Sequence, residues 1–314
     1  MSREVYIHIG YPKTGTTFLQ NEIFPKLNEV HYIRSDRIRP ETSKIMRQEE
    51  FSFDYEQVKN NLEKHLVDGK NLISNEGFMG NLLVGKAINN KLIADRLAFL
   101  FPNVKIIITI RNQYDLVESL YKQYIQLGGT KTLREFVKFK EGRFEHNDFR
   151  WDLTLSPEMF NYATLAAYYE KLVGRENVFL ISFELLQKDP ARFLDQLLKW
   201  MGVDETPSHN NRAYNQGYGR RQIAIARFLN RFLKSIYREN GLIPDVRFPL
   251  AGKIDTGKLR LILQSNISRR MLGNKPITDP FLRAEIKKMH SETNKSLDQR
   301  YSLHLQEICP NAYF

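Results

Sequence analysis

The chain has little cysteine and no long apolar run, and each absence excludes a class of protein. One cysteine, Cys309, occurs in the 314 residues, so no disulfide can form within the chain and no multi-cysteine metal site can be built. No uncharged apolar run reaches the roughly 18 residues that span a bilayer. The start of the chain, Met1–Ile9, has the pattern of a strand rather than of a secretion signal. We therefore expect a soluble protein in the reducing cytoplasm, without a transmembrane segment.

The overall composition is that of a globular, basic protein. Hydrophobic residues make up 42% of the sequence, which is enough to fill a sizeable core. The sequence contains no internal repeat, low-complexity tract or linker-like stretch, so we expect a single domain over residues 1–314. The formal net charge of +11 favours an anionic partner. Charge alone leaves nucleic acid, a membrane surface, an acidic polymer and a phosphorylated small molecule open.

Short apolar runs alternate with longer helix-like stretches through the first two thirds of the chain. This alternation predicts an α/β fold with three layers, in which helices cover both faces of a central parallel sheet. From Ser208 onward the sequence is basic and helix-like, which predicts a helical C-terminal part. The expected strands are Glu4–Ile9, Val30–Arg34, Asn71–Asn75, Val104–Ile110 and Asn177–Phe183.

Two helix starts are marked by capping residues. Asp189 and Pro190 precede an apolar stripe that ends before Gly202, which predicts a helix with a capping aspartate, a first-turn proline and a C-terminal glycine. Asn112 follows the expected strand Val104–Ile110 and precedes a second apolar stripe. We expect it to cap the helix that begins there.

A glycine-containing loop, Gly10–Thr17, follows the first expected strand and precedes an amphipathic helix. In that context, backbone N–H groups and the helix start bind phosphate. The two glycines have the spacing of the NTP-binding loop, but Lys13 precedes Gly15, whereas the lysine of an NTPase follows the second glycine. Arg111 directly follows the strand Val104–Ile110, at the position where a magnesium-dependent NTPase usually has an aspartate. Both departures indicate a phosphate site that uses protein charge in place of magnesium.

The loop resembles the 5′-phosphosulfate loop of the sulfotransferase superfamily, which commonly has the sequence Pro-Lys-(Thr/Ser)-Gly-Thr-(Thr/Ser). Residues 12–17 are Pro-Lys-Thr-Gly-Thr-Thr. A second motif of that superfamily is an arginine at a strand end with a serine eight residues later, which hold the donor's 3′-phosphate. Arg111 and Ser119 have that spacing. Weaker similarity to bacterial members extends over most of the chain.

The resemblance implies a sulfotransferase that moves a sulfuryl group from 3′-phosphoadenosine 5′-phosphosulfate to a hydroxyl or amine, of a carbohydrate or a small molecule, without a metal ion. Arg220 and Arg221 stand where family members have a basic loop that closes over the 3′-phosphate and adenine. The implied donor-binding residues are Pro12, Lys13, Thr14, Gly15, Thr16, Thr17, Arg111, Ser119, Arg220 and Arg221.

Sulfuryl transfer needs a positive group for the bridging oxygen of the donor and a base for the acceptor's proton. Lys13 can supply the charge. Glu76 is our first choice as general base, because it follows the third expected strand and the carboxyl ends of parallel strands meet where ligands bind. His31 and Asp36, near the end of the second strand, are the next candidates. His8 lies on the first strand in alternation with Tyr6 and Gly10, so we expect it to be packed, or to support a site residue, rather than to act as the base.

The acceptor site has fewer signals. The segment 141–151 mixes aromatic, charged and amide side chains between expected helices, a composition suited to sugar or aromatic acceptors. His146 and Trp151 are its candidate acceptor-binding residues. His31 and Asp36 are further candidates for contact with the acceptor.

Two other classes of function remain open from the residues alone. A P-loop kinase-like phosphotransferase has the same order of strand, loop and helix, and it differs by requiring magnesium. A non-catalytic protein could bind polyanions through the basic surface, or bind the nucleotide and signal without turnover. The loop sequence favours the enzyme, with a nucleotide donor and an acceptor as partners and no nucleic acid.

Overall fold

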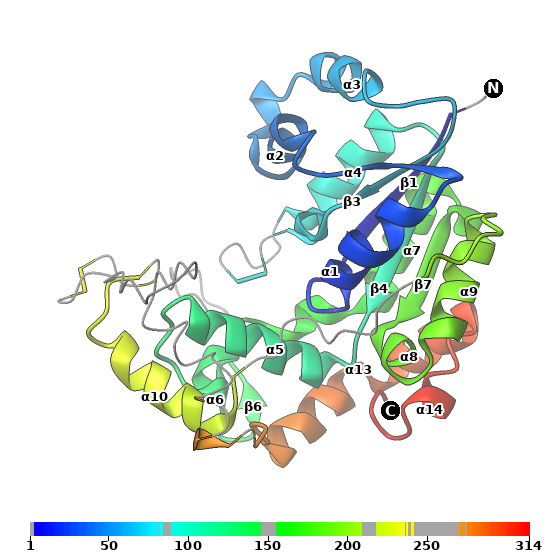
Figure 1. The fold of residues 1–314 in the computed structure, drawn as a ribbon. Helices are drawn as coiled ribbons and strands as arrows, with labels where there is room; N and C mark the ends of the chain where they lie inside the picture. Colours follow the sequence, from blue (N-terminus) through cyan, green and yellow to red (C-terminus); the bar gives the residue numbers. More distant parts are fainter. Residues whose placement is uncertain are drawn as a thin grey trace. The chain divides into compact units, whose positions relative to one another are not determined.

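The computed structural model describes residues 3–80, 82–83, 89–145, 155–208, 218–235, 237, 240–241, 268, 271–273 and 275–314 (Figure 1). Contacts group the chain into two compact units. The first unit comprises Met1–Gln113, Glu158–Tyr214 and Lys287–Phe314, and the second comprises Tyr114–Pro157 and Asn215–Ile286. The expectation of a single domain over residues 1–314 stays a prediction.

The first unit is built on a sheet of five parallel strands in the order β2-β3-β1-β4-β7. All five expected strands are confirmed, with bounds that differ by at most two residues. Strands β2 and β3 lie on one side of β1, and the later strands β4 and β7 lie on its other side. The strand order therefore reverses at β1, which is the switch point of the sheet. Ligands bind at such a point, outside the carboxyl ends of the strands. The strands are β1 (Arg3–Gly10), β2 (Val30–Ile33), β3 (Gly69–Ser74), β4 (Val104–Ile110) and β7 (Val178–Ser182).

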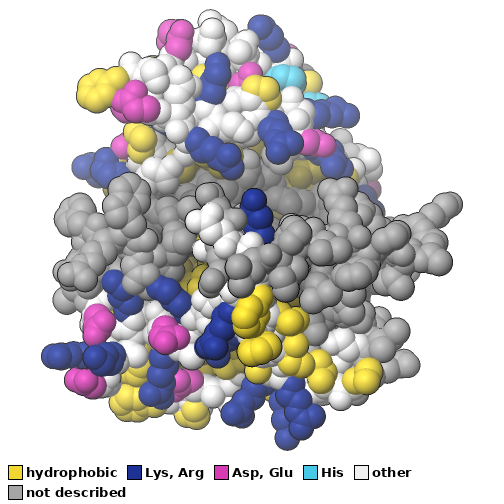
Figure 2. All heavy atoms as spheres, turned by 90° about the vertical axis from the view of Figure 1, so that its left-hand side faces the viewer, with side chains coloured by type: hydrophobic (Ala, Val, Ile, Leu, Met, Phe, Trp, Pro, Cys, Tyr) yellow, Lys and Arg dark blue, Asp and Glu magenta, His cyan; other side chains and the backbone are white. Residues whose placement is uncertain are grey.

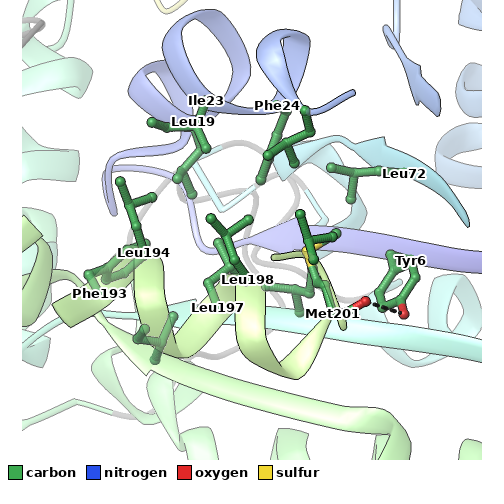
Figure 3. Close-up of a cluster of buried hydrophobic side chains, with 14 of the residues drawn as sticks. Tyr6, Leu19, Ile23, Phe24, Leu72, Phe193, Leu194, Leu197, Leu198 and Met201 are labelled. Carbon is green, nitrogen blue, oxygen red and sulfur yellow. Dashed lines mark hydrogen bonds between the residues drawn. The ribbon is translucent and has the colours of Figure 1, made fainter. Parts of the chain in front are cut away.

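One face of the sheet packs against helix α9 (Pro190–Trp200) and against the segment that follows the Gly10–Thr17 loop (Figure 3). The predicted α9 is confirmed, since the Asp189 side chain accepts a hydrogen bond from Arg192 N and Pro190 occupies the first turn. Every second residue of a strand points to the same face, so strands β3, β1, β4 and β7 contribute one apolar side chain each to a buried cluster. Those side chains are Tyr6, Leu72, Ile107 and Ile181, and they meet Leu19, Ile23, Phe24, Phe193, Leu194, Leu197 and Leu198.

The helix after the loop is shorter and less regular than the sequence indicates. It begins as α1 (Thr16–Phe18), widens into a π-helical turn, η1 (Leu19–Ile23), and tightens into the 3₁₀ turn η2 (Phe24–Lys26). Pro25 has no backbone N–H to continue the helix, which accounts for the change at this point. Leu19, Ile23 and Phe24 are nevertheless fully buried, so the apolar face that the amphipathic pattern predicts does pack into the core.

Other helices complete the layers of the first unit. Helix α7 (Tyr162–Val173) contacts β4, β7 and α4 (Asn90–Leu100), so helices flank the central sheet and the α/β class is confirmed. No helix among the residues placed in the structure is long and apolar enough to cross a membrane. The remaining elements of this unit include α2 (Arg39–Arg47), η3 (Glu50–Ser52), α3 (Tyr55–Glu63), η4 (Glu76–Met79), η5 (Pro157–Phe160), η6 (Arg175–Asn177), α8 (Phe183–Lys188) and α14 (Leu305–Ile308).

The second unit is mainly helical. Its aromatic side chains form a core in which the rings of Tyr124 and Phe136 stack with centroids 4.9 Å apart. Asn112 directly precedes α5, as expected for a residue at the start of the helix. The confirmed helical C-terminal part includes α13, whose residues from Lys287 onward belong to the first unit. The elements are α5 (Gln113–Gln126), α6 (Leu133–Phe136), β5 (Phe139–Lys140), β6 (Arg143–Phe144), α10 (Arg220–Asn230) and α13 (Pro280–Tyr301).

Candidate active site

The loop after β1 has a backbone that few sequences can adopt. Gly10 has φ of 97° and Gly15 has φ of 84°, in the left-handed region that glycine tolerates best. A Cβ at Gly15 would lie 2.6 Å from Leu186 Cδ2, so close packing also requires glycine there. Lys13 has φ of 68°, which is unusual for a residue with a Cβ. The loop therefore turns sharply at three points and leads into α1 from Gly15.

A buried chain of hydrogen bonds supports the loop from below. Thr14 Oγ1 donates to the Tyr11 carbonyl at 2.5 Å and lies 2.5 Å from Thr109 Oγ1 of β4. Thr109 Oγ1 in turn lies 3.2 Å from His8 Nε2, and His8 Nδ1 lies 2.8 Å from Ser74 Oγ. His8, Thr14, Ser74 and Thr109 are fully buried. The chain thus ties the loop to three neighbouring strands, β3, β1 and β4.

The direction of each hydrogen bond in this chain follows from the number of available hydrogens. Thr14 has one hydroxyl hydrogen and gives it to the Tyr11 carbonyl, so Thr109 must donate to Thr14. Thr109 then accepts from Nε2–H of His8, and the unprotonated Nδ1 accepts from the Ser74 hydroxyl. Burial lowers the pKa of His8 to about 3, which agrees with this neutral form. His8 is therefore a packed, neutral residue, as its place on the strand predicts.

Glu76 lies beside the loop, directly after β3 and Asn75. Its Oε2 accepts a hydrogen bond from Thr16 Oγ1 at 2.6 Å, and the glutamate side chain is otherwise exposed. The Asn75 side chain accepts from Gly77 N at 2.9 Å and so fixes the turn that presents Glu76. A Cβ at Gly10 would lie 3.4 Å from Glu76 Cα, which shows how closely the two backbones approach.

Lys13 and Arg111 bring positive charge to the same loop. Arg111 Nη1 donates to the Lys13 carbonyl at 3.0 Å, and its guanidinium lies 5.0 Å from the centre of the Phe183 ring. Burial lowers the pKa of the Lys13 amine, the Glu76 carboxylate opposes that effect, and the Arg111 charge adds to it. Lys13 of the loop therefore interacts electrostatically with one carboxylate, that of Glu76, and with one further cation, Arg111.

The two alternative bases lie farther along the sheet. His31 is exposed on β2 and in register with Asn71, which pairs with Val5 on β1. Gly10 lies five positions beyond Val5 on β1, a rise of roughly 16 Å. Asp36 lies in the turn after β2, is exposed, and accepts a hydrogen bond from Arg34 Nε at 3.3 Å that lowers its pKa. Of the three candidate bases, Glu76 is the one that contacts a loop side chain.

The other predicted residues fall into two groups. Ser119 is half-buried in α5, and Arg220 and Arg221 are exposed in the first turn of α10, all three in the second unit. His146 and Trp151 lie outside the residues that the structure describes. The roles assigned to all five from the sequence stay predictions.

Sequence reasoning missed the side chains that surround Arg111. Tyr162 Oη donates to the Arg111 carbonyl at 2.6 Å, and Glu184 accepts from the next backbone N–H, that of Asn112, at 2.8 Å. Glu184 follows β7 closely, so the carboxyl-edge argument that selected Glu76 could have selected it as well. Tyr162 has no such signal, because its contact depends on how α7 packs.

The five-stranded parallel sheet and the loop at its switch point define an α/β protein with a P-loop-like order of strand, loop and helix. The sequence profile described as "Sulfotransferase domain" matches residues 4–216, which is more than half of the chain. The chain therefore belongs to the sulfotransferase family. No curated protein matches the chain significantly in sequence.

Several solved structures are similar to this chain, all at low sequence identity. A sulfotransferase from Alicyclobacillus acidocaldarius has 18% identity and a TM-score of 0.46, with 68% of this chain and 87% of that chain covered. A mouse sulfotransferase complexed with PAP has 14% identity and a TM-score of 0.42, with 96% and 88% covered. The sulfotransferase domain from the curacin biosynthetic pathway has 14% identity and a TM-score of 0.41, with 94% and 98% covered.

No group of three or more His, Cys, Asp or Glu residues that could hold a metal ion occurs in the part of the chain that the structure describes. The expectation of metal-independent transfer rests on Lys13 and stays a prediction.

Proposed function

We propose that the protein transfers a sulfuryl group from 3′-phosphoadenosine 5′-phosphosulfate to a hydroxyl or amine of a carbohydrate or small molecule. One observation carries the proposal. Lys13 and Thr16 belong to a single loop that contacts both other charged residues of the site. The Lys13 carbonyl accepts a hydrogen bond from Arg111, and the Thr16 hydroxyl donates one to Glu76. A cation for the leaving group, a cation for a second phosphate and a candidate base are thus assembled around one phosphate-binding turn.

The donor side of the site follows from the loop. In this proposal the backbone N–H groups of Lys13–Thr17 and the Thr17 hydroxyl bind the 5′-phosphosulfate, and Arg111 binds the 3′-phosphate. Ser119, Arg220 and Arg221 join the donor site on the strength of the family resemblance. The half-buried Lys13 suits the leaving group, since a charge that is partly shielded from water acts more strongly on a developing anion.

The reaction requires one bond to form, one to break and one proton to move. The acceptor oxygen or nitrogen attacks sulfur, the bond between sulfur and the bridging phosphate oxygen breaks, and that oxygen keeps the electron pair. In the proposal Lys13 stabilises the charge on the leaving oxygen. Glu76 takes the acceptor's proton. The hydrogen bond from Thr16 supports this role, because it holds the Glu76 carboxylate beside the loop that carries Lys13.

Transfer of labelled sulfate tests the proposal directly. The protein is incubated with sulfur-labelled donor and a panel of sugars, amino sugars, phenols and aliphatic alcohols, with and without an excess of chelator. We expect labelled product in the presence of the chelator and no phosphoryl transfer from γ-labelled ATP. Transfer from ATP that requires magnesium, without transfer of sulfate, would instead establish the kinase-like alternative. Titration with adenosine 3′,5′-bisphosphate tests the donor site independently of the acceptor.

The basic surface gives the polyanion-binding alternative its only support. On the face drawn in Figure 2, Lys and Arg side chains are interspersed with Asp and Glu, so the basic residues visible there are not one uninterrupted patch. A polyanion-binding protein would bind many polymers in a salt-dependent way. Its affinity would be unaffected by Lys13→Ala, whereas the sulfotransferase would lose turnover.

A further inference from the structure

The peptide unit between Arg111 and Asn112 lies just beyond the end of strand β4 and is not part of the sheet. Strand β4 ends at Ile110, which pairs with Ser182 of β7, and α5 begins two residues after Arg111. Asn112 is buried, so the polar groups of this peptide need partners from within the protein. The sheet no longer supplies them, and side chains must do so.

Two buried side chains bind the two polar groups of this one peptide. Tyr162 Oη donates to its carbonyl oxygen at 2.6 Å, and Glu184 Oε1 accepts from its N–H at 2.8 Å. Both side chains are buried, and they come from α7 and α8. A peptide held at both its oxygen and its nitrogen cannot rotate about the chain direction without breaking a buried hydrogen bond.

A third side chain holds the second oxygen of Glu184. Tyr313 Oη donates to Glu184 Oε2 at 2.6 Å, and the Tyr313 carbonyl accepts from Asn294 Nδ2 at 3.1 Å. The Asn112 side chain also donates to the carbonyl of Ala312, the residue before Tyr313. Each oxygen of the Glu184 carboxyl group therefore has its own donor, and the segment that carries Tyr313 is tied to the strand end twice.

The charge on Arg111 takes part in the same arrangement. Burial raises the pKa of Glu184, whereas its hydrogen bonds with Tyr313 and Asn112 and the positive charge of Arg111 act in the opposite direction. The guanidinium itself donates to the Lys13 carbonyl at 3.0 Å. Arg111 is thus fixed at its backbone and contacts the loop with its side chain.

We propose that Tyr162, Glu184 and Tyr313 are positioning residues that orient Arg111 toward the 3′-phosphate of the donor. We call these three residues the peptide clamp. The inference rests on the proposed function, in which Arg111 binds that phosphate. Charge-assisted hydrogen bonds depend on direction, so a turn of the Arg111 backbone would weaken recognition of the 3′-phosphate more than binding of the rest of the nucleotide.

The selectivity for the 3′-phosphate is the quantity that tests the clamp. Calorimetric titration gives the Kd of adenosine 3′,5′-bisphosphate and of adenosine 5′-monophosphate, and their ratio isolates the contribution of the 3′-phosphate. We expect Arg111→Ala to lower this selectivity roughly 10- to 150-fold, the effect of losing a charged hydrogen-bond donor. Tyr162→Phe and Tyr313→Phe should each lower it roughly 2- to 10-fold, the effect of one neutral hydrogen bond.

Tyr6→Phe is the matched control. Tyr6 is equally buried, and its hydroxyl also forms a hydrogen bond, to Glu4 Oε2 at 3.0 Å, and lies 3.0 Å from the backbone carbonyl of Met201. It lies toward the other end of β1, where it pairs with Leu72 and Lys105. This variant should lose stability as the clamp variants do and keep the selectivity of the wild type.

The possible outcomes separate the clamp from the proposed function. Lost selectivity in Arg111→Ala with full selectivity in both clamp variants would overturn the clamp and leave the proposed function intact. Full selectivity in Arg111→Ala would overturn the assignment of the 3′-phosphate, and the clamp with it. Tyr162 and Tyr313 act on opposite sides of the same peptide, so one folded variant of the two is enough to decide.

Discussion

The two ends of the central sheet carry the same three kinds of side chain in different surroundings. Toward the amino end, Glu4 accepts a hydrogen bond from Tyr6 Oη at 3.0 Å and lies 3.5 Å from Lys105 Nζ. At the carboxyl end, Glu76 accepts one from Thr16 Oγ1 at 2.6 Å and acts electrostatically on Lys13. A carboxylate, a hydroxyl and a lysine are therefore present twice. Their chemistry alone does not explain why only one set is proposed to act.

The backbone around each set makes the difference. The set at the amino end lies on regular strands, and its ion pair is partly open to water, where such pairs contribute about 1 kcal/mol or less. The set at the carboxyl end lies on a loop with positive φ at Lys13 and two glycines, next to Arg111 and above a buried hydrogen-bond chain. In the proposed function, the groups at the carboxyl end act because this turn brings them together, and matched substitutions at the two ends can test that difference.

Replacing the two glutamates should give the largest contrast. Glu76→Gln removes the proposed base and keeps an oxygen that can accept from Thr16, so the loop should stay in place. We expect sulfuryl transfer to fall roughly 10²- to 10⁴-fold, the usual contribution of a general base, with unchanged affinity for adenosine 3′,5′-bisphosphate. Turnover at saturating donor, together with calorimetric titration, measures both quantities.

Glu4→Gln is the control for this change, because Glu4 also accepts from a hydroxyl and lies beside a lysine. It should leave transfer within about twofold of the wild type, since a surface substitution usually changes stability by less than about 0.5 kcal/mol. Full transfer in Glu76→Gln would refute Glu76 as the base and return the role to Asp36 or His31.

Replacing the two lysines should give the next largest effect. Lys13→Ala removes the proposed partner of the leaving oxygen, and we expect turnover to fall roughly 10²- to 10³-fold, the usual loss for one group that stabilises developing charge. Lys105→Ala removes a lysine of the same sheet that pairs with Glu4 and should leave turnover unchanged. Equal turnover in the two variants would show that the loop needs no cation at Lys13.

The sequence was sufficient to predict the sheet and the loop. Most of the strands are short runs rich in Val and Ile, so their places were evident from local pattern, and β4 (Val104–Ile110) was predicted to the residue. The position of Lys13 before Gly15 is a local feature as well. Such features depend on neighbours in the chain, which are visible without a structure.

The hydrogen-bond partners could not be predicted in the same way. Glu184 and Tyr313 are 129 residues apart, and His8 and Thr109 are 101 residues apart. Contacts of this kind depend on how helices and strands pack. The hydrophobic periodicity of the sequence does not indicate which distant residues will come into contact. The irregular turn η1 (Leu19–Ile23) was missed as well, because the spacing of buried positions in the sequence does not distinguish a π-helical turn from a regular helix.

The buried chain beneath the loop gives the smallest of the three effects, on stability rather than on turnover. The pKa of His8 is about 3 in the folded protein and about 6.5 in an unfolded chain, so the unfolded state binds more protons between these values. The free energy of unfolding therefore falls with falling pH below about 6.5, by about 2 kcal/mol between pH 7 and pH 5. His8→Gln removes the titrating group and should lose that part of the pH dependence.

Urea denaturation at the two pH values measures this difference. Trp200 reports on the first unit, because its ring packs on Phe179 with centroids 5.1 Å apart and on Tyr6 with centroids 5.7 Å apart. The chain has two tryptophans, so a Trp151→Phe background leaves Trp200 as the sole source of tryptophan fluorescence. If wild type and His8→Gln lost the same free energy between pH 7 and pH 5, the neutral His8 in the chain of hydrogen bonds would be refuted. The support beneath the loop would then have to come from Thr14 and Thr109 alone.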